Sequence, residues 1–355
     1  MAHQQIKNVR ISGFAACVPK NIEENASLDL FKTDDDYKAF VAAVGVERRR
    51  KAPKEICASD MCFAAAEKLI AELDWQKDEI DCLIFASNSP DYIAPATSCL
   101  LQNRLGLSTE CMSLDISYGC SAWVYGLSTL ASIVSASKFR KALLFTGDTT
   151  LRTKSPKDKS TWPLFGDAGT VTAIEYQEGA IGLRTHMAAD GSSHRAIIIE
   201  DGGHRNPFSM QSLKEETFEG GIVRNRMQTN LDGMSVFSFG ITKAPKSIRK
   251  LLDKHKLDIN HLDYLVLHQA NKMMNEKIRQ KLGIPPHKTP SVLKDFGNTS
   301  SASIPLTIVS ELRNVINDPE QEKLNILACG FGVGLSWGSI LFSLEHAICC
   351  QIIEL

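Results

Sequence analysis

Apolar residues along the chain fall into two repeating patterns, which predict alternating strands and helices. Three short apolar runs bounded by polar or turn-forming residues are typical of buried strands: CLIFAS (82–87), CMSLDIS (111–117) and KALLFTG (141–147). Two longer segments, 59–73 and 121–138, repeat apolar or small residues at helical spacing. Strands that alternate with helices predict an α/β fold whose sheets are buried between helical layers.

The second half of the sequence repeats the order of motifs found in the first half. EIDCLIFASNS (79–89) resembles HLDYLVLHQAN (261–271), and KALLFTG resembles LNILACG (324–330). Between these matches, SYGCSA (117–122) resembles DFGNTS (295–300). The matching segments lie about 180 positions apart. We interpret this order as an internal duplication, with chance resemblance between generic strands as the alternative.

The duplication divides the chain into an N-terminal half (1–178), a connecting segment (179–230) and a C-terminal half (231–355). The connecting segment is long and rich in Gly, Asp, His and Arg. A connection of this length is usually functional, so we interpret it as an excursion over the surface or a lid.

Cys120 lies where a predicted strand ends and a predicted helix begins. A thiol at that place gains from the helix N-terminus, which favours thiolate. The duplication gives Asn298 the equivalent position in the second half, and His268 ends the strand LDYLVLH. If two similar halves pack about a pseudo-two-fold axis, these three side chains meet in one cleft. The alternatives are a small buried hydrophobe, a structural histidine and a helix N-cap.

Composition narrows the class of protein. The chain has 355 residues, 43% of them hydrophobic, and a formal net charge of -1. The near-neutral charge argues against general binding to nucleic acid or anionic membrane. The first residues lack the pattern of a secretory signal, and no apolar run reaches spanning length, so we expect a cytoplasmic protein whose ten cysteines are reduced. Zinc-binding motifs are missing, and we expect no metal.

Four motifs taken together resemble the β-ketoacyl-ACP synthase III family: GCSA around Cys120, HQAN from His268, GNTSSASIP around Asn298, and GFGVGLSWGS (330–339). GVERRR and FGDAGT fall in the expected order, and the resemblance extends over nearly the whole chain. It implies the thiolase fold, in which two duplicated halves build an αβαβα stack of layers.

The resemblance also implies a catalytic triad of Cys120, His268 and Asn298. Cys120 attacks an acyl thioester and holds the acyl group. His268 and Asn298 then donate hydrogen bonds to the thioester carbonyl of malonyl-ACP while CO₂ leaves, and the enolate attacks the acyl-cysteine. The backbone N–H groups of Cys120 and Val333 are the expected oxyanion hole. The implied enzyme is an acyltransferase of fatty-acid or specialised acyl-chain biosynthesis, a homodimer that works with acyl carrier protein and needs no cofactor.

Substrate contacts follow from the same resemblance. Arg152 matches an arginine expected against the adenine ring of CoA, and Asn271 matches an asparagine near the pantetheine arm. Tyr37 and Ala43 stand where the family typically has Trp and Arg, which puts acetyl-CoA priming in doubt. Ala94 replaces a bulky aromatic that several members contribute across the dimer. The smaller residue predicts room for a longer or branched acyl group.

Two clusters of basic residues predict either solvated faces or a docking site for the acidic carrier protein. One follows His268 on a predicted helix and the other follows Arg152 in a loop. The residues are Lys272, Lys277, Arg279 and Lys281 in the first cluster, and Lys154, Lys157 and Lys159 in the second.

Three rival functions remain open on the sequence. Some relatives use the same triad to transfer an acyl group to an oxygen, nitrogen or carbon acceptor without decarboxylation, so the motifs do not separate the two reactions. A degradative thiolase would need a second cysteine in the C-terminal glycine turn, and Cys329 is one residue out of place. A non-catalytic partner subunit would typically lose the nucleophile, whereas Cys120 is present.

Overall fold

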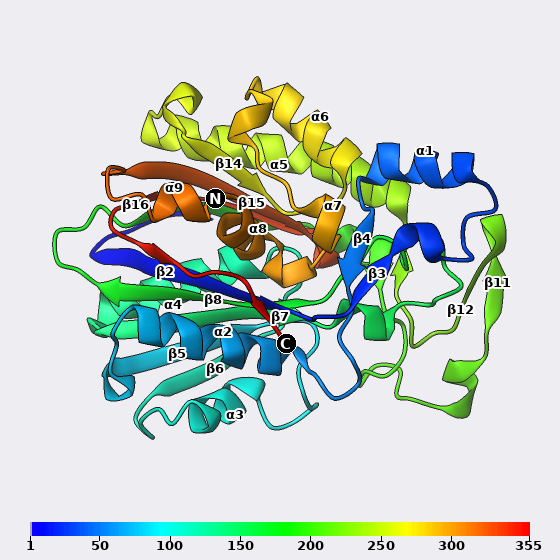
Figure 1. The fold of residues 1–355 in the computed structure, drawn as a ribbon, viewed down its shortest axis with the longest axis horizontal. Coiled ribbons are helices and arrows are strands. Elements are labelled where there is room, and N and C mark those ends of the chain that lie inside the picture. Colours follow the sequence, from blue (N-terminus) through cyan, green and yellow to red (C-terminus); the bar gives the residue numbers. More distant parts are fainter. Residues whose placement is uncertain (1) are drawn as a thin grey trace.

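The computed structural model describes residues 2–355, in which two large β-sheets alternate with three layers of helices (Figure 1). The middle helices pack against both sheets, and the other helices cover the two outer faces. The main helices, from one outer layer to the other, are α2 (Ala58–Glu72), α3 (Thr97–Arg104), α4 (Ala122–Ser137), α8 (Ser303–Glu311), α5 (Gly233–His255) and α6 (Lys272–Leu282). This αβαβα arrangement is the fold that the sequence predicts.

Each sheet belongs mainly to one half of the chain. The first sheet has the order β17 (Ile348–Cys349), β2 (Val9–Val18), β8 (Ala168–Tyr176), β7 (Lys141–Asp148), β5 (Ile80–Ala86) and β6 (Met112–Ile116), with β18 (Ile353–Glu354) also paired to β2. The second sheet has the order β1 (Ala2–Ile6), β9 (Leu183–Ala189), β16 (Ser336–Leu344), β15 (Leu324–Gly332) and β14 (Tyr264–Leu267).

Strand directions show the duplication. In the first sheet β5 is parallel to β7, which is antiparallel to β8, which is antiparallel to β2. In the second sheet β14, β15, β16 and β9 have the same order and the same directions. The matched sequences at 79–89 and 261–271 become β5 and β14, and those ending near 147 and 330 become β7 and β15. The β9 strand falls within the segment 179–230, yet it is an integral part of the second sheet.

The central helix α4 lies between the two sheets, and most of its residues are apolar or small and buried. Trp123 is buried in this layer and donates its indole N–H to Thr172 on β8 at 2.9 Å. Despite the apolar character of α4, none of the helices within residues 2–355 is long and apolar enough to cross a bilayer.

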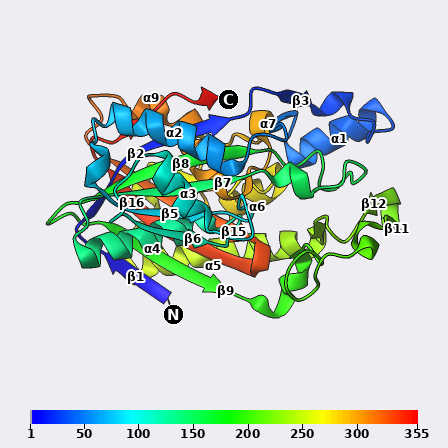
Figure 2. The ribbon, with the colours of Figure 1, turned by 90° about the horizontal axis from the view of Figure 1, so that it is seen from below.

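After β9, the rest of the connecting segment between the halves lies outside the two large sheets. Both views place β11 (Glu216–Phe218), β12 (Ile222–Arg224) and α1 (Asp34–Val44) at one end of the molecule (Figures 1 and 2). On the way, β10 (Ile197–Ile198) pairs with β13 (Asn230–Leu231). The remaining short strands and α-helices are β3 (Ile22–Glu24), β4 (Arg48–Arg50), α7 (Leu293–Phe296) and α9 (Arg313–Ile316).

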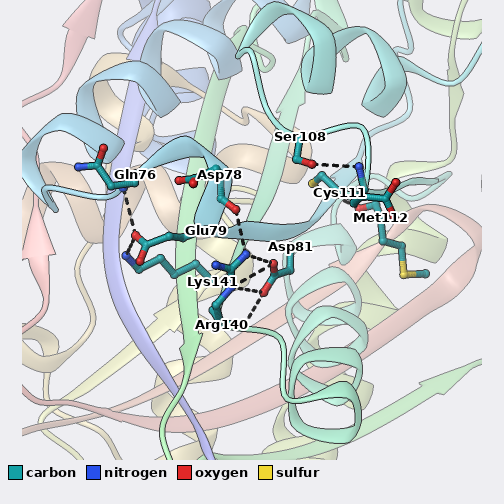
Figure 3. Close-up of polar contacts among 10 residues, drawn as sticks. Gln76, Asp78, Glu79, Asp81, Ser108, Cys111, Met112, Arg140 and Lys141 are labelled. Atoms are coloured by element: carbon teal, nitrogen blue, oxygen red, sulfur yellow. Dashed lines mark hydrogen bonds and ion pairs between the residues drawn. The ribbon is translucent and has the colours of Figure 1, made fainter.

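Ion pairs hold the amino ends of two parallel strands in the first sheet. Arg140 and Lys141, at the start of β7, face Asp81 and Glu79 at the start of β5 (Figure 3). Arg140 donates to Asp81 at 2.6 Å. Such partly exposed pairs contribute little stability. The carboxyl ends of the same strands, where ligands bind in open α/β sheets, therefore lie at the opposite edge, where Asp148 ends β7.

Candidate active site

A cavity of about 390 Å³ is lined by Cys120, His268 and Asn298 together. Cys120 lies two residues ahead of α4, and His268 directly follows β14. Asn298 lies between α7 and the 3₁₀ turn η9 (Ser300–Ala302). The structure thus brings together three residues from both halves, in the cleft that the duplication predicts.

Cys120 is partly exposed at the cavity, and the C-terminal glycine turn closes around it. The backbone N–H of Val333 acts on the Cys120 sulfur and favours its thiolate form. A Cβ atom at residue 332 would lie only 2.7 Å from Cys120 Sγ, so Gly332 is required for this close approach. A hydrogen bond of 2.7 Å between Ser121 and Ser336 ties the start of α4 to the same turn.

The pKa of the Cys120 thiol is raised, and burial is the main cause. The negative charge of Asp148 acts in the same direction. Hydrogen bonds from Val333 and Ser300 and the positive charge of Lys154 oppose the shift without overcoming it. Burial therefore acts against the thiolate form that a helix N-terminus favours.

His268 is buried, and its ring is held on two sides. Its Nδ1 atom lies 2.6 Å from the hydroxyl oxygen of Ser303 on α8. Phe331 contacts it edge-to-face, with ring centroids 5.6 Å apart. Asn275 fixes the backbone by donating to the His268 carbonyl at 3.1 Å. Burial lowers the pKa of His268 to about 3, so the imidazole is neutral at neutral pH.

Asn298 is positioned by a tight loop. Its Oδ1 atom accepts the backbone N–H of Ser300 at 2.9 Å, which leaves the side-chain NH₂ group as the donor. Its backbone N–H donates to the Leu164 carbonyl at 2.9 Å, and its own carbonyl accepts from Gly166. The preceding Gly297 has a φ of 64°, and a Cβ there would lie 2.7 Å from the Leu164 oxygen. Only glycine fits this position.

Asp148 is a cavity residue that the sequence reasoning missed. One of its carboxylate oxygens accepts from Ser87 Oγ, Asn88 N and Ser89 Oγ at 2.8 to 3.0 Å. The other accepts the backbone N–H of Ser301 at 3.1 Å, and thereby joins a loop of each half. The sequence did contain a signal for this residue, because a charged side chain at the end of an apolar strand marks a candidate site residue.

Arg152 does not lie in the cavity lining, although the sequence suggested a contact with CoA. Its guanidinium donates to the carbonyl oxygens of Pro53, Lys54 and Ile56 at 3.2, 2.9 and 2.6 Å. The side chain therefore holds the loop ahead of α2.

Asn271 does line the cavity. Its side chain also caps α6, because Oδ1 accepts the backbone N–H of Met274 at 2.8 Å. Ala94 is exposed in the loop ahead of α3 and does not line the cavity of this single chain.

Two of the four basic residues on α6 are engaged within the chain. Arg279 pairs with Glu276, and Lys281 donates to the Ile241 carbonyl at 2.9 Å. Lys272 and Lys277 are exposed. In the other predicted basic cluster, Lys154 is buried, so the interpretation of that loop as a solvated face is wrong at this residue.

Cys329 is fully buried in β15 and does not line the cavity. Its sulfur accepts a hydrogen bond from Ser339 at 3.4 Å, and burial raises its pKa to about 12. The structure thus gives no support to Cys329 as the second cysteine of a degradative thiolase.

The duplicated five-layered fold, with a cysteine, a histidine and an asparagine in one cavity, defines a thiolase-fold enzyme. Residues 114–191 match the family described as 3-oxoacyl-[acyl-carrier-protein (ACP)] synthase III, and residues 252–344 match its C-terminal part. Over 336 residues the chain is 30% identical to the beta-ketoacyl-[acyl-carrier-protein] synthase III of Streptococcus pneumoniae. The aligned region covers 94% of this chain and 99% of that relative. The chain belongs to the β-ketoacyl-[acyl-carrier-protein] synthase III family.

Solved structures agree with this assignment. The crystal structure of a 3-oxoacyl-(acyl-carrier protein) synthase from Burkholderia xenovorans has a TM-score of 0.91 and 34% identity, with 99% of each chain covered. That of 3-oxoacyl-(acyl carrier protein) synthase III from Pseudomonas aeruginosa has a TM-score of 0.79 and 27% identity, with 97% of this chain and 100% of that chain covered.

Proposed function

We propose that this protein loads an acyl group onto Cys120 and condenses it with malonyl-ACP to give a β-ketoacyl product. The observation that carries the proposal is the single cavity that holds Cys120, His268 and Asn298. Membership of the synthase III family supports the same reaction.

The first step transfers the acyl group. The Cys120 sulfur attacks the thioester carbonyl of the donor, a new C–S bond forms, and the donor thiol leaves with the proton that Cys120 gives up. The oxyanion of the tetrahedral intermediate accepts hydrogen bonds from the backbone N–H groups of Cys120 and Val333. The position of the Val333 N–H on the thiol supports this assignment.

The second step forms the carbon–carbon bond. The malonyl thioester loses CO₂, and the electron pair of the broken bond becomes an enolate. Neutral His268 and the NH₂ group of Asn298 donate hydrogen bonds to the enolate oxygen. The enolate carbon attacks the acyl-Cys120 carbonyl, and the cysteine sulfur leaves. Burial supports the neutral form of the histidine, since its pKa is lowered to about 3.

The partners follow from the same proposal. The acceptor is malonyl-ACP, and exposed Lys272 and Lys277 on α6 attract the acidic carrier protein. The chain acts as a cytoplasmic homodimer without a resident cofactor. Replacing both lysines with glutamate should raise the KM for malonyl-ACP and leave loading from acyl-CoA at the wild-type rate.

Intact-protein mass tests the proposal. Wild type and Cys120→Ala are incubated with acyl-CoA and acyl-ACP donors of rising length, and malonyl-ACP is then added. We expect a mass gain on wild type alone, followed by its loss as β-ketoacyl-ACP forms. If malonyl-ACP never discharges the acyl group, the protein is a transferase to another acceptor. If no donor loads, the triad has no nucleophilic role and a partner-subunit function replaces this proposal.

A further inference from the structure

Lys154 places a buried ammonium group in the wall of the catalytic cavity. The residue follows the 3₁₀ turn η3 (Thr150–Thr153), lines the same cavity as Cys120, and is only 7% exposed. Its Nζ atom donates to the hydroxyls of Thr229 at 2.9 Å and Thr153 at 3.1 Å. It also lies 4.4 Å from the ring centroid of Phe165.

No carboxylate of residues 2–355 lies within ion-pair distance of this ammonium group. Lysine is almost never this deeply buried unless it is paired, because desolvating a charge is costly. Lys154 therefore differs from an ordinary core residue. Its hydrogen-bond partners are neutral hydroxyls, and the residue lines the cavity.

The acidic groups around Lys154 are Asp148, Asp158 and Asp167. The negative charge of each favours the protonated, charged form of the lysine. All three are engaged elsewhere. Asp158 accepts from Ser160 and Thr161, Asp167 accepts from the backbone of Ala52 and Leu151, and Asp148 holds the loops already described. Burial lowers the pKa of Lys154 to about 8, and Cys120 and these carboxylates oppose the shift, so the group is mostly protonated at neutral pH.

Two hydroxyl groups of the cavity wall contact Lys154, whereas a hydrocarbon chain would favour an apolar wall. Hydroxyl side chains that line the same cavity include Ser89, Thr149, Thr150, Thr153 and Thr229, and the last two contact Lys154. Hydroxyls accept from an ammonium group and donate to an anion equally well. The same cavity is also lined by Ile197, Ile199 and Val236, which provide apolar surface.

We propose that Lys154, together with Thr153 and Thr229, binds a carboxylate at the far end of the acyl group carried by Cys120. The enzyme thus selects short acyl thioesters that end in a carboxylate. This inference rests on the proposed function, since it names the acyl class that the same site receives. The leaving carboxylate of malonyl-ACP is a poor occupant, because an ammonium contact would stabilise the charge that decarboxylation must remove.

The experiment compares loading from donors matched in length. Succinyl-, glutaryl- and adipyl-CoA compete with butyryl-, valeryl- and hexanoyl-CoA, and intact mass reports the acyl group on Cys120. Wild type should load the carboxylate series preferentially. In Lys154→Met this preference should fall about ten- to a hundredfold, the usual effect of losing hydrogen bonds to a charged group. Lys154→Arg should keep part of it. Lys68→Met, which removes an exposed lysine paired with Glu72 on α2, should match wild type.

Two results would overturn the inference and leave the proposed function standing: wild type loads the uncharged series preferentially at every length, or Lys154→Met slows both series equally. The second result would mean that Lys154 acts on the thiol rather than on the acyl group. If neither series nor any acyl-ACP loads, the proposed function and the inference both fail.

Discussion

The hydroxyl oxygen of Ser303 lies 2.6 Å from Nδ1 of His268, so a residue on the central helix α8 orients the ring of the cavity histidine. In a neutral imidazole one nitrogen donates and the other accepts, and the hydrogen bond at one therefore decides what the other can do.

Replacing Ser303 with alanine should slow condensation roughly three- to tenfold, the effect of one lost hydrogen bond. The loading of Cys120 should change less, because the proposed chemistry uses His268 in the second step. Single-turnover measurements of Cys120 acylation and of β-ketoacyl formation give the rates of the two steps separately. Ser303→Thr keeps the hydroxyl and should restore the rate if the extra methyl fits. Equal losses in both steps would contradict a role through His268.

Alkylation of Cys120 should report a raised pKa. Because burial disfavours thiolate, the rate with iodoacetamide, measured at the Cys120 peptide, should still be rising above pH 9. Exposed Cys99 serves as the internal reference. Asp148→Asn should move the Cys120 profile to lower pH, and Lys154→Met should move it higher, since the two charges act in opposite directions. A midpoint below that of a free cysteine peptide would contradict the assignment of burial as the main cause.

Gly332→Ala should block the nucleophile. The added Cβ would lie 2.4 Å from the Cβ of Cys120 and 2.7 Å from its sulfur, so the thiol must move. A displacement of about 1 Å typically costs roughly a hundredfold in rate, and loading should fall by that amount. Gly334→Ala is the matched control: it also strains a positive φ, but its new Cβ meets no atom within 4 Å. If both variants load equally well, close approach at residue 332 is not what matters.

Acid should destabilise the fold partly through His268. Its pKa falls from 6.5 to about 3 on burial, so below pH 6.5 the unfolded chain binds a proton that the folded chain does not. Stability therefore falls as the pH drops from 6.5, and His268 contributes about 2 kcal/mol of that loss at pH 5.

Urea unfolding of wild type and His268→Gln at pH 7 and pH 5 measures the contribution of His268 to this loss of stability. The variant should lose less stability than wild type between the two pH values. Equal losses would show that His268 is protonated in the folded protein, contrary to its burial.

The sequence by itself determined the elements and their repetition. The run CLIFAS became β5 and KALLFTG became β7, because strands buried on both faces are apolar throughout, a property that is visible locally. It also gave Cys120 and Asn298 equivalent positions in two similar halves and placed His268 at the end of a strand of the second half. Because the two halves are duplicated, equivalent positions can be matched from the sequence. The expected symmetry between the halves was therefore enough to predict that the three side chains meet in one cleft.

Only the tertiary structure decided the electrostatics. A basic loop in the sequence gave no sign that Lys154 would turn inward while Arg152 turned outward to the loop at 53–56. The place of Cys120 ahead of a helix is local and could be predicted, whereas the burial that raises its pKa involves segments such as the turn at Gly332 and Val333, more than two hundred residues away. Charge states depend on which distant segments exclude water, and the order of residues along the chain does not specify that until the chain has folded.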